Sequence, residues 1–275
     1  MVYRHKETIM NYDPIYTSGI QKAINEKAGQ RLTCDGQFGA KSQAALKVLQ
    51  TKLGVPATGV YDALTYSYLD SFIKAKYLTF DSIKRSSASL GVQDAHIRTV
   101  CEVESNGAGF LPDGRVKILF ERHHFLASIK KRLPAATVAK LLLSDPDIVS
   151  ATPGGYVGNE GEYARFNRAK AIDEYSAIYA TSFGLFQIMG FNYGDAGYGD
   201  IHEFLAGMCT SETNHLLAFT NFNKVYRKGV LWTALKNRDW ATYALNYNGT
   251  AYAKNKYDTK LNDAFVKFSK NIFAY

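Results

Sequence analysis

The sequence predicts a mainly α protein with two domains. A chain of 275 residues, 46% of them hydrophobic, is long enough to build more than one buried core. Apolar residues recur at helical spacing along most of the chain, and glycine turns separate the stripes. Charged residues make up only 21%, and prolines number 6, which argues against long disordered segments.

Three short helices are expected near the N-terminus, after a tail at residues 1–16. The first carries the apolar stripe Ile20, Ala23 and Ile24 and ends near Gly29. A CDGQFG turn leads to a second helix, which ends before Gly54 and has an apolar face of Ala45, Leu46, Leu49 and Leu53. A third helix is predicted over 62–76. Residues 17–76 would then form a unit of about 60 residues, near the lower limit for independent folding.

A second domain is expected at residues 91–275. The polar, serine-rich stretch before it, with SIKRSSAS at its centre, predicts a linker at residues 77–90. Helical stripes recur later, at Trp240, Tyr243, Ala244 and Tyr247, and again from Tyr257 through Leu261 and Phe265 to Phe268. An extended segment over 116–120 follows a PDG turn, so we predict an α-rich domain with a small β hairpin.

One acidic residue of this domain stands at the end of an apolar stripe. Ile97, Val100, Cys101 and Glu104 share one helix face, whereas Glu102 should face outward. Burial and the negative end of the helix dipole both oppose ionisation of Glu104, and a raised pKa is what a general acid needs at neutral pH. A buried Glu paired with an Arg for structural reasons is the alternative.

Three motifs in this domain carry a resemblance to known enzymes. VESNG around Glu104, TSFGLFQIMG at 181–190 and ALNYNG at 244–249 resemble, in the same order, segments of goose-type lysozymes and soluble lytic transglycosylases. Together with VESNGAGFLPDGRVKILFERHHF they closely resemble the N-acetylmuramidase domain of bacteriophage endolysins. The resemblance covers essentially all of residues 91–275.

The resemblance implies roles for particular residues. Glu104 matches the catalytic acid, which protonates the glycosidic oxygen between N-acetylmuramic acid and N-acetylglucosamine. Ser105 and Ser182 should lie close to it. The residues that match the lining of the sugar-binding site are Gln187, Ile188, Tyr247 and Asn248. Ordinary core packing remains the alternative for Tyr247.

The N-terminal unit resembles the peptidoglycan-binding module of many wall hydrolases. The matching residues are Asp35, Gly36, Phe38, Gly39, Ala45, Gln50, Gly59, Thr65 and Leu69. Most of these matches are interpreted as determinants of the fold. The module would tether the enzyme to its substrate.

A second catalytic carboxylate is less obvious than the first. Glu121 follows the extended segment and could face the site, although an ion pair with Arg122 or His123 is a competing role. Hydrolysis normally uses two carboxylates, whereas a lytic transglycosylase needs only one. No Cys, His and carboxylate cluster has metal-ligand spacing, so we expect no metal and no cofactor.

The formal net charge of +8 favours polyanionic partners, which include nucleic acid, anionic lipid and the bacterial envelope. No Lys/Arg block interleaved with aromatic residues is present, which argues against nucleic acid. Without an apolar run of signal-peptide or membrane-spanning length, we expect synthesis in the host cytoplasm, no stable membrane insertion and passage to the periplasmic wall through a holin-type pore. A monomer is expected.

The sequence thus predicts a phage endolysin that degrades peptidoglycan as a muramidase and lyses the host. A lytic transglycosylase of the same architecture, which releases an anhydro-sugar, is the first alternative. A non-catalytic wall-binding or phage tail protein is the second.

Overall fold

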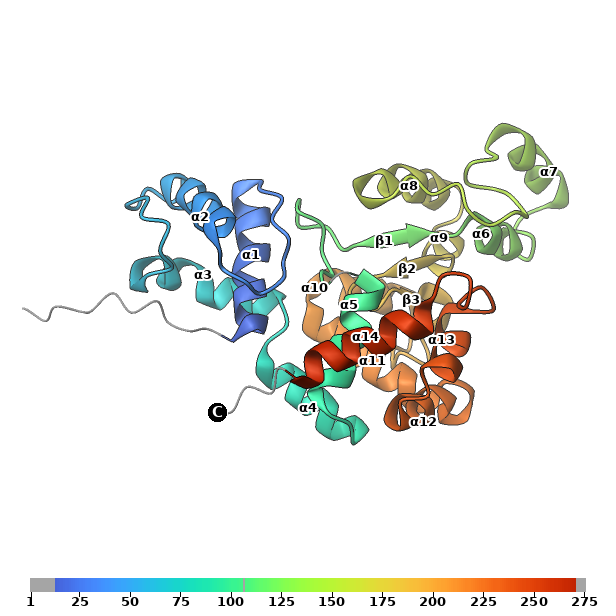
Figure 1. Cartoon of the computed structure of the whole chain (residues 1–275). Helices are drawn as coiled ribbons and strands as arrows, with labels where there is room; N and C mark the ends of the chain where they lie inside the picture. The colour runs from blue at the N-terminus through green and yellow to red at the C-terminus, as the bar shows by residue number, and fades with distance from the viewer. Residues whose placement is uncertain (1–12, 106, 271–275) are drawn as a thin grey trace, which may run out of the picture.

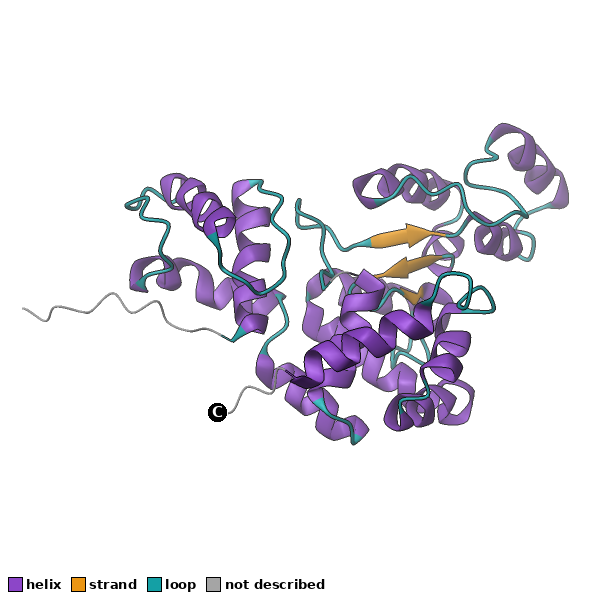
Figure 2. Cartoon of the chain, in the orientation of Figure 1, coloured by secondary structure: helices purple, strands orange, loops and turns teal. Residues whose placement is uncertain are grey.

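The computed structural model describes residues 13–105 and 107–270. Helices dominate the described chain, and three short strands form one small antiparallel sheet (Figure 2). The first three helices gather on one side of the molecule, and the remaining elements form the larger part (Figure 1). The prediction of a mainly α fold with a three-helix N-terminal module and a small β hairpin is confirmed, and a third strand extends the hairpin into a sheet.

The N-terminal module consists of α1 (Pro14–Ala28), α2 (Ala40–Lys52) and α3 (Ala63–Lys76). Helix α1 starts inside the predicted tail, because the Asp13 carboxylate accepts hydrogen bonds from two backbone N–H groups and Pro14 suits the first helical position. The predicted boundary at residue 16 was therefore wrong. The helix ends at Gly29 in the left-handed conformation, as the stripe predicted.

Several motif residues of the module hold its loops together. The buried Gln50 amide donates to Thr65 Oγ1 at 3.0 Å and accepts from the Gly59 N–H at 2.8 Å, so it ties α2 to the following turn and to α3. At Gly36, with φ of 76°, an added Cβ would lie 2.4 Å from the Pro14 carbonyl oxygen. These contacts bear out the interpretation that such residues determine the fold.

The segment predicted as a linker is instead mostly helix α4 (Phe80–Leu90). Thr79 and Ser82 form a reciprocal capping box at its start. Three of its serines, Ser82, Ser86 and Ser87, are buried. Ser86 Oγ lies 2.6 Å from Thr220 Oγ1, and Ser87 Oγ donates to Asp94 Oδ1. The serine-rich composition therefore reflects packing of α4 against α11 and α5, not a solvated connection.

The larger part begins with α5 (Asp94–Ser105) and strand β1 (Ile118–Phe120). The helices that follow are α6 (Arg122–Ile129), α7 (Ala135–Ser144), α8 (Glu162–Ile172) and α9 (Glu174–Tyr179). Strands β2 (Thr181–Phe183) and β3 (Ile188–Met189) complete the sheet. The chain ends in α10 (Ile201–Thr210), α11 (Glu212–Val225), α12 (Val230–Asn237), α13 (Trp240–Asn248) and α14 (Tyr257–Lys270). Three 3-10 turns are η1 (Asn159–Gly161), η2 (Gly190–Asn192) and η3 (Tyr226–Gly229).

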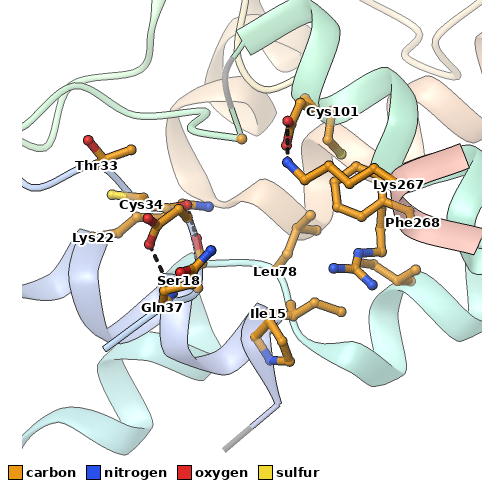
Figure 3. A pocket seen from close by; sticks show the side chains of 17 residues that line it. Ile15, Ser18, Lys22, Thr33, Cys34, Gln37, Leu78, Cys101, Lys267 and Phe268 are labelled. Atoms are coloured by element: carbon orange, nitrogen blue, oxygen red, sulfur yellow. Dashed lines mark hydrogen bonds and ion pairs between the residues drawn. The ribbon is translucent and has the colours of Figure 1, made fainter. Parts of the chain in front are cut away.

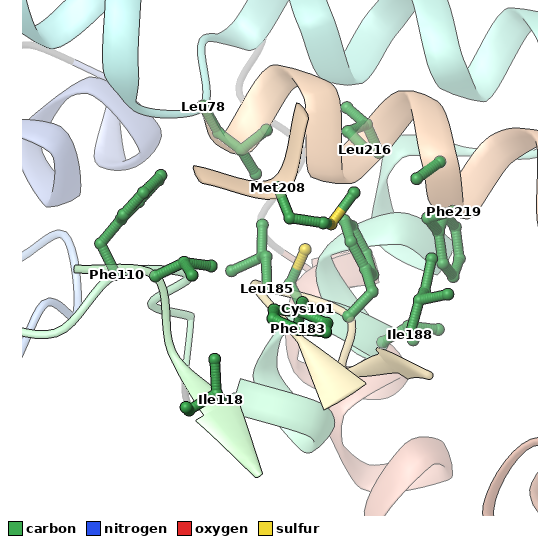
Figure 4. Packing of buried hydrophobic residues seen from close by; sticks show 14 of the residues in the cluster. Leu78, Cys101, Phe110, Ile118, Phe183, Leu185, Ile188, Met208, Leu216 and Phe219 are labelled. Atoms are coloured by element: carbon green, nitrogen blue, oxygen red, sulfur yellow. The ribbon is translucent and has the colours of Figure 1, made fainter. Parts of the chain in front are cut away.

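The sheet has the order β1-β2-β3, with Leu119 opposite Ser182 and Ser182 opposite Met189. Its apolar side chains pack with α10 and α11: Phe183, Leu185 and Ile188 surround Met208 and Phe219 (Figure 4). Helix α14 lies along α5, the helix that carries Glu104 (Figure 1). The sheet and α5 are thus held by one continuous core.

The module and the larger part meet around one buried carboxylate, Glu212 at the start of α11. Lys22 of α1 donates to both of its oxygens, at 2.9 and 2.8 Å. The backbone N–H groups of Leu78 and Gly109 also donate to it, at 3.0 and 2.8 Å.

Within the described chain, no helix is both long and apolar enough to cross a membrane.

Candidate active site

A cavity of about 590 Å³ lies between the end of α5, the β2–β3 turn and α13. Two carboxylates, Glu104 and Glu121, both line it. The other lining residues are His124, Ser182, Gln187, Met189, Phe191, Tyr226, Arg227, Leu245, Asn246, Tyr247, Asn248, Gly249 and Thr250. Two acidic groups in one cavity are the minimum that glycosidic hydrolysis normally uses.

Glu104 is the more strongly perturbed of the two acids. Burial raises its pKa to about 7, although a hydrogen bond from Asn248 and the charge of Lys260 both lower it. The Asn248 amide donates to Glu104 Oε1 at 2.9 Å. Glu102 faces outward, as the helix periodicity predicted, and pairs with Lys267 at 2.6 Å. A carboxyl with a pKa near neutrality can give up a proton at neutral pH.

Glu121 sits between β1 and α6, and its surroundings are polar. The Tyr156 hydroxyl donates to both of its carboxylate oxygens, at 2.8 and 3.0 Å, and His123 Nδ1 lies 3.3 Å from Oε2. Arg122 instead donates to backbone carbonyls, among them that of Thr152 at 2.8 Å. Of the two residues predicted to compete for this carboxylate, His123 and not Arg122 lies beside it.

The sheet forms a polar wall of the cavity. Ser182 Oγ donates to Gln187 Oε1 at 2.9 Å, and Gln187 Nε2 donates to the Gly184 carbonyl at 2.8 Å. Gln187 has a φ of 49°, a left-handed conformation that is unusual for a residue other than glycine. Strain of this kind is found preferentially at functional sites.

Helix α13 forms the facing wall. Tyr247 donates its hydroxyl to the Phe186 carbonyl at 2.6 Å, so it connects α13 to the β2–β3 turn. Asn248 presents its amide to Glu104, while its Oδ1 is buried without a hydrogen-bond partner among the described residues. An unsatisfied buried acceptor in the wall of a cavity is suited to a ligand N–H or O–H group.

Two of the residues that the resemblance assigned to the site lie elsewhere. The Ser105 hydroxyl donates to the Cys101 carbonyl of its own helix at 3.0 Å, and the residue is buried outside the cavity lining. Ile188 points into the core beside Phe219 (Figure 4). Both outcomes have local causes: alternate residues of a strand face opposite sides, so Ile188 points away from the cavity that Met189 lines, and a helix-terminal serine can bond back to its own helix.

The sequence did not single out Tyr156, His124, Phe191 or Arg227 at this site. Burial lowers the pKa of His124 to about 4, so this cavity residue is neutral at pH 7. Its ring lies 5.1 Å from that of Phe191. Tyr156 comes from a loop, Phe191 and Arg227 come from 3-10 turns, and His124 lies in the first turn of α6, so no shared local pattern points to them.

A second cavity, of about 580 Å³, lies where the module meets the larger part (Figure 3). Its carboxylates are engaged in structure: Glu102 pairs with Lys267, and Asp35 accepts from Gln21 Nε2 and the Gln37 N–H. The cavity that holds Glu104 is therefore the better candidate for chemistry.

The chain is similar to known proteins over most of its length. The model of the N-acetylmuramidase family matches residues 93–269. The chain belongs to the N-acetylmuramidase family. A model described as a putative peptidoglycan binding domain matches residues 20–69 of this muramidase. No curated protein matches the chain.

The crystal structure of the Burkholderia AP3 phage endolysin is similar to this muramidase. The two chains are 38% identical, with a TM-score of 0.62, and the match covers 93% of this chain and 95% of that one. The muramidase is thus a lysozyme-type glycoside hydrolase with a peptidoglycan-binding module, and its substrate is peptidoglycan.

Proposed function

We propose that this muramidase is a phage endolysin that hydrolyses the β-1,4 bond between N-acetylmuramic acid and N-acetylglucosamine, with Glu104 as general acid. The observation that carries the proposal is the half-buried Glu104, whose carboxyl has a pKa raised to about 7, in the wall of a cavity that also holds Glu121. Similarity to the Burkholderia AP3 phage endolysin supports the endolysin assignment.

Bond cleavage begins with proton transfer from Glu104 to the glycosidic oxygen. Because its pKa is raised to about 7, Glu104 can hold a proton at neutral pH, where an ordinary carboxyl is ionised. The Asn248 N–H group bonds Oε1, so it orients the carboxyl and stabilises the carboxylate left after the transfer. Departure of the leaving sugar then generates an oxocarbenium-like centre.

Glu121 is proposed as the second catalytic group, which activates water or stabilises this centre. Its carboxylate is held in place by the two contacts of the Tyr156 hydroxyl, and it lines the same cavity as Glu104. Support for this role is the different environment of the two acids: one is enclosed, and the other is surrounded by hydrogen-bonding groups.

Four residues are proposed to contact the sugars: Ser182, Gln187, Tyr247 and Asn248. All four line the cavity. The unpartnered Asn248 Oδ1 is placed to accept from an acetamido N–H or a hydroxyl of the substrate. The Tyr247 ring supplies an apolar face for a pyranose.

In the host, we propose that the enzyme is made in the cytoplasm as a monomer and reaches the periplasmic wall after a holin-type pore opens the membrane. Expression in host cells with and without such a pore tests this step. Lysis at the same rate in both would exclude the dependence on a pore.

The decisive experiment is mass spectrometry of fragments released from purified peptidoglycan by the wild type, Glu104→Gln and Glu121→Gln. Glu102→Gln, which changes an exposed acid on the same helix, is the matched control. We expect reducing muropeptides from the wild type and the control and none from Glu104→Gln. Anhydro-muropeptides would establish transglycosylation instead, and an active Glu104→Gln variant would exclude Glu104 as the acid.

A further inference from the structure

Arg227 is a cation in the wall of the catalytic cavity, and the proposed bond cleavage gives it no role. It lies in η3, the turn between α11 and α12, and it is exposed. Arg227 is the only basic side chain other than the neutral His124 among the described lining residues, and the acids there are Glu104 and Glu121. A guanidinium remains charged at every physiological pH.

The backbone of this turn is strained. Arg227 has φ 46° and ψ 49°, and Lys228 has φ 61° and ψ 34°, so two consecutive residues other than glycine occupy the left-handed region. Gly229 follows in the same region, with φ 81°. Residues with a Cβ adopt this conformation at a cost in free energy. The reversal places Arg227 in the cavity wall, while Lys228 is exposed outside the lining.

The Arg227 side chain is oriented but not neutralised. Its Nη1 donates to Asn246 Oδ1 at 3.3 Å, and its guanidinium carbon lies 5.3 Å from the centre of the Tyr226 ring. Within residues 13–105 and 107–270, no acidic side chain forms an ion pair with it. The contact with Asn246 uses one of five N–H donors, so a fork of donors remains for a ligand.

The charge of Arg227 is not explained by an effect on the pKa of Glu104. The cation that lowers the pKa of Glu104 is Lys260 of α14, which lies outside the cavity lining. Arg227 is not among the groups that shift this pKa. Its charge is therefore available to the substrate.

We propose that Arg227 binds a carboxylate on the muramic acid arm of peptidoglycan and thereby selects muramic acid over neutral sugars at this position. This inference rests on the proposed function. The glycan backbone of peptidoglycan is neutral apart from the lactyl group of muramic acid and the peptide stem that it carries, and both offer carboxylates. A planar guanidinium matches a carboxylate with two parallel hydrogen bonds. The positive charge of Arg227 also offsets the repulsion between a substrate carboxylate and the acids Glu104 and Glu121.

The two sources of the carboxylate are distinguished by substrate. Intact strands have stem carboxylates, and their lactyl carboxyl is blocked as an amide. Strands stripped by an amidase have only the free lactyl carboxylate. Stripped strands in which this carboxyl is converted to a methylamide have the same sugars and no carboxylate.

The test compares Arg227→Gln with Lys228→Gln, which removes the neighbouring charge in the same strained turn but outside the cavity. We expect Arg227→Gln to raise KM about ten-fold or more on intact strands if it binds the stem, or on stripped strands if it binds the lactyl group. Both variants should match the wild type on methylamide strands. Arg227→Lys should restore part of the loss, because it keeps the charge without the fork.

Equal KM values for Arg227→Gln and Lys228→Gln on all three substrates would overturn the proposal. A rise in KM of Arg227→Gln on methylamide strands as large as that on the other strands would overturn it as well. Thermal melting of each variant verifies its folding. Failure of the proposed function would be seen separately, because the wild type itself would then release no Glu104-dependent fragments.

Discussion

At the residue scale, the enzyme depends on a carboxyl that its fold keeps from ionising easily. Glu104 ends an apolar helix face, and burial outweighs the hydrogen bond of Asn248 and the charge of Lys260 in setting its pKa. The same burial that prepares a proton donor also costs stability whenever the group ionises.

This cost predicts a pH-dependent stability. The pKa of Glu104 rises from 4.5 to about 7 on folding, so the native state binds more protons between these values and loses stability as pH rises through them. The loss is about 3 kcal/mol at pH 8, at 1.36 kcal/mol per pKa unit. Glu104→Gln should therefore be more stable than the wild type at pH 8 and equal to it near pH 4, as measured by urea denaturation. A wild type that stays level with the variant across this range would contradict the raised pKa.

The ionisation of Glu104 should also set the alkaline limit of activity. As general acid, Glu104 must be protonated, so the rate should fall as pH rises through about 7. Lys260→Gln removes a charge that lowers the pKa of Glu104. At low salt it should therefore move the fall in rate to higher pH, by a fraction of a pH unit. Lys254→Gln, in the preceding loop, is the control and should leave the pH profile unchanged.

At the element scale, the sheet positions one wall of the cavity, and its last turn has no room for a side chain. Gly190 follows β3 and begins η2, beside the end of α9. A Cβ there would lie 1.9 Å from the Ile178 carbonyl oxygen, a backbone atom that cannot move away independently. Met189 and Gln187, just before this turn, line the cavity.

Gly190→Ala should therefore destabilise the protein by about 3 kcal/mol or more and lower its activity, because β3 must shift. Gly194→Ala is the matched control, since no atom lies within 4 Å of its added Cβ. Denaturant unfolding and fragment release measure the two effects. Similar behaviour of both variants would show that the β3 turn has more freedom than its packing indicates.

At the scale of the whole molecule, the binding module is joined to the catalytic part by a buried ion pair. Lys22 and Glu212 have side chains 9% and 0% exposed, respectively. The same carboxylate holds the backbone at Gly109, five residues after Glu104, and at Leu78, just before α4. One acidic group thus connects the module, the segment after the catalytic helix and α11.

Lys22→Met should cost about 3–5 kcal/mol, because it leaves the Glu212 charge buried without its cation. Calorimetry should show one cooperative transition for the wild type and a separate, earlier transition of the module in the variant. Lys41→Met, at an exposed position of the same module, should be neutral. The double variant Lys22→Met and Glu212→Gln should recover part of the loss. Two separate transitions in the wild type would contradict this coupling.

Local patterns in the sequence determined much of this protein. Apolar periodicity gave the helices of the module and placed Glu104 inward and Glu102 outward, because a helix face depends only on residue spacing. Gly29 marked the end of the first helix for a similarly local reason.

The tertiary structure decided what depends on contacts between distant segments. It placed Ser86 of α4 against Thr220 of α11, brought Tyr156 to Glu121, and brought Arg227 to the cavity wall. Each of these outcomes depends on which surfaces pack together across long stretches of chain. Residue spacing carries no information about those contacts, because it describes only neighbours along the helix or strand.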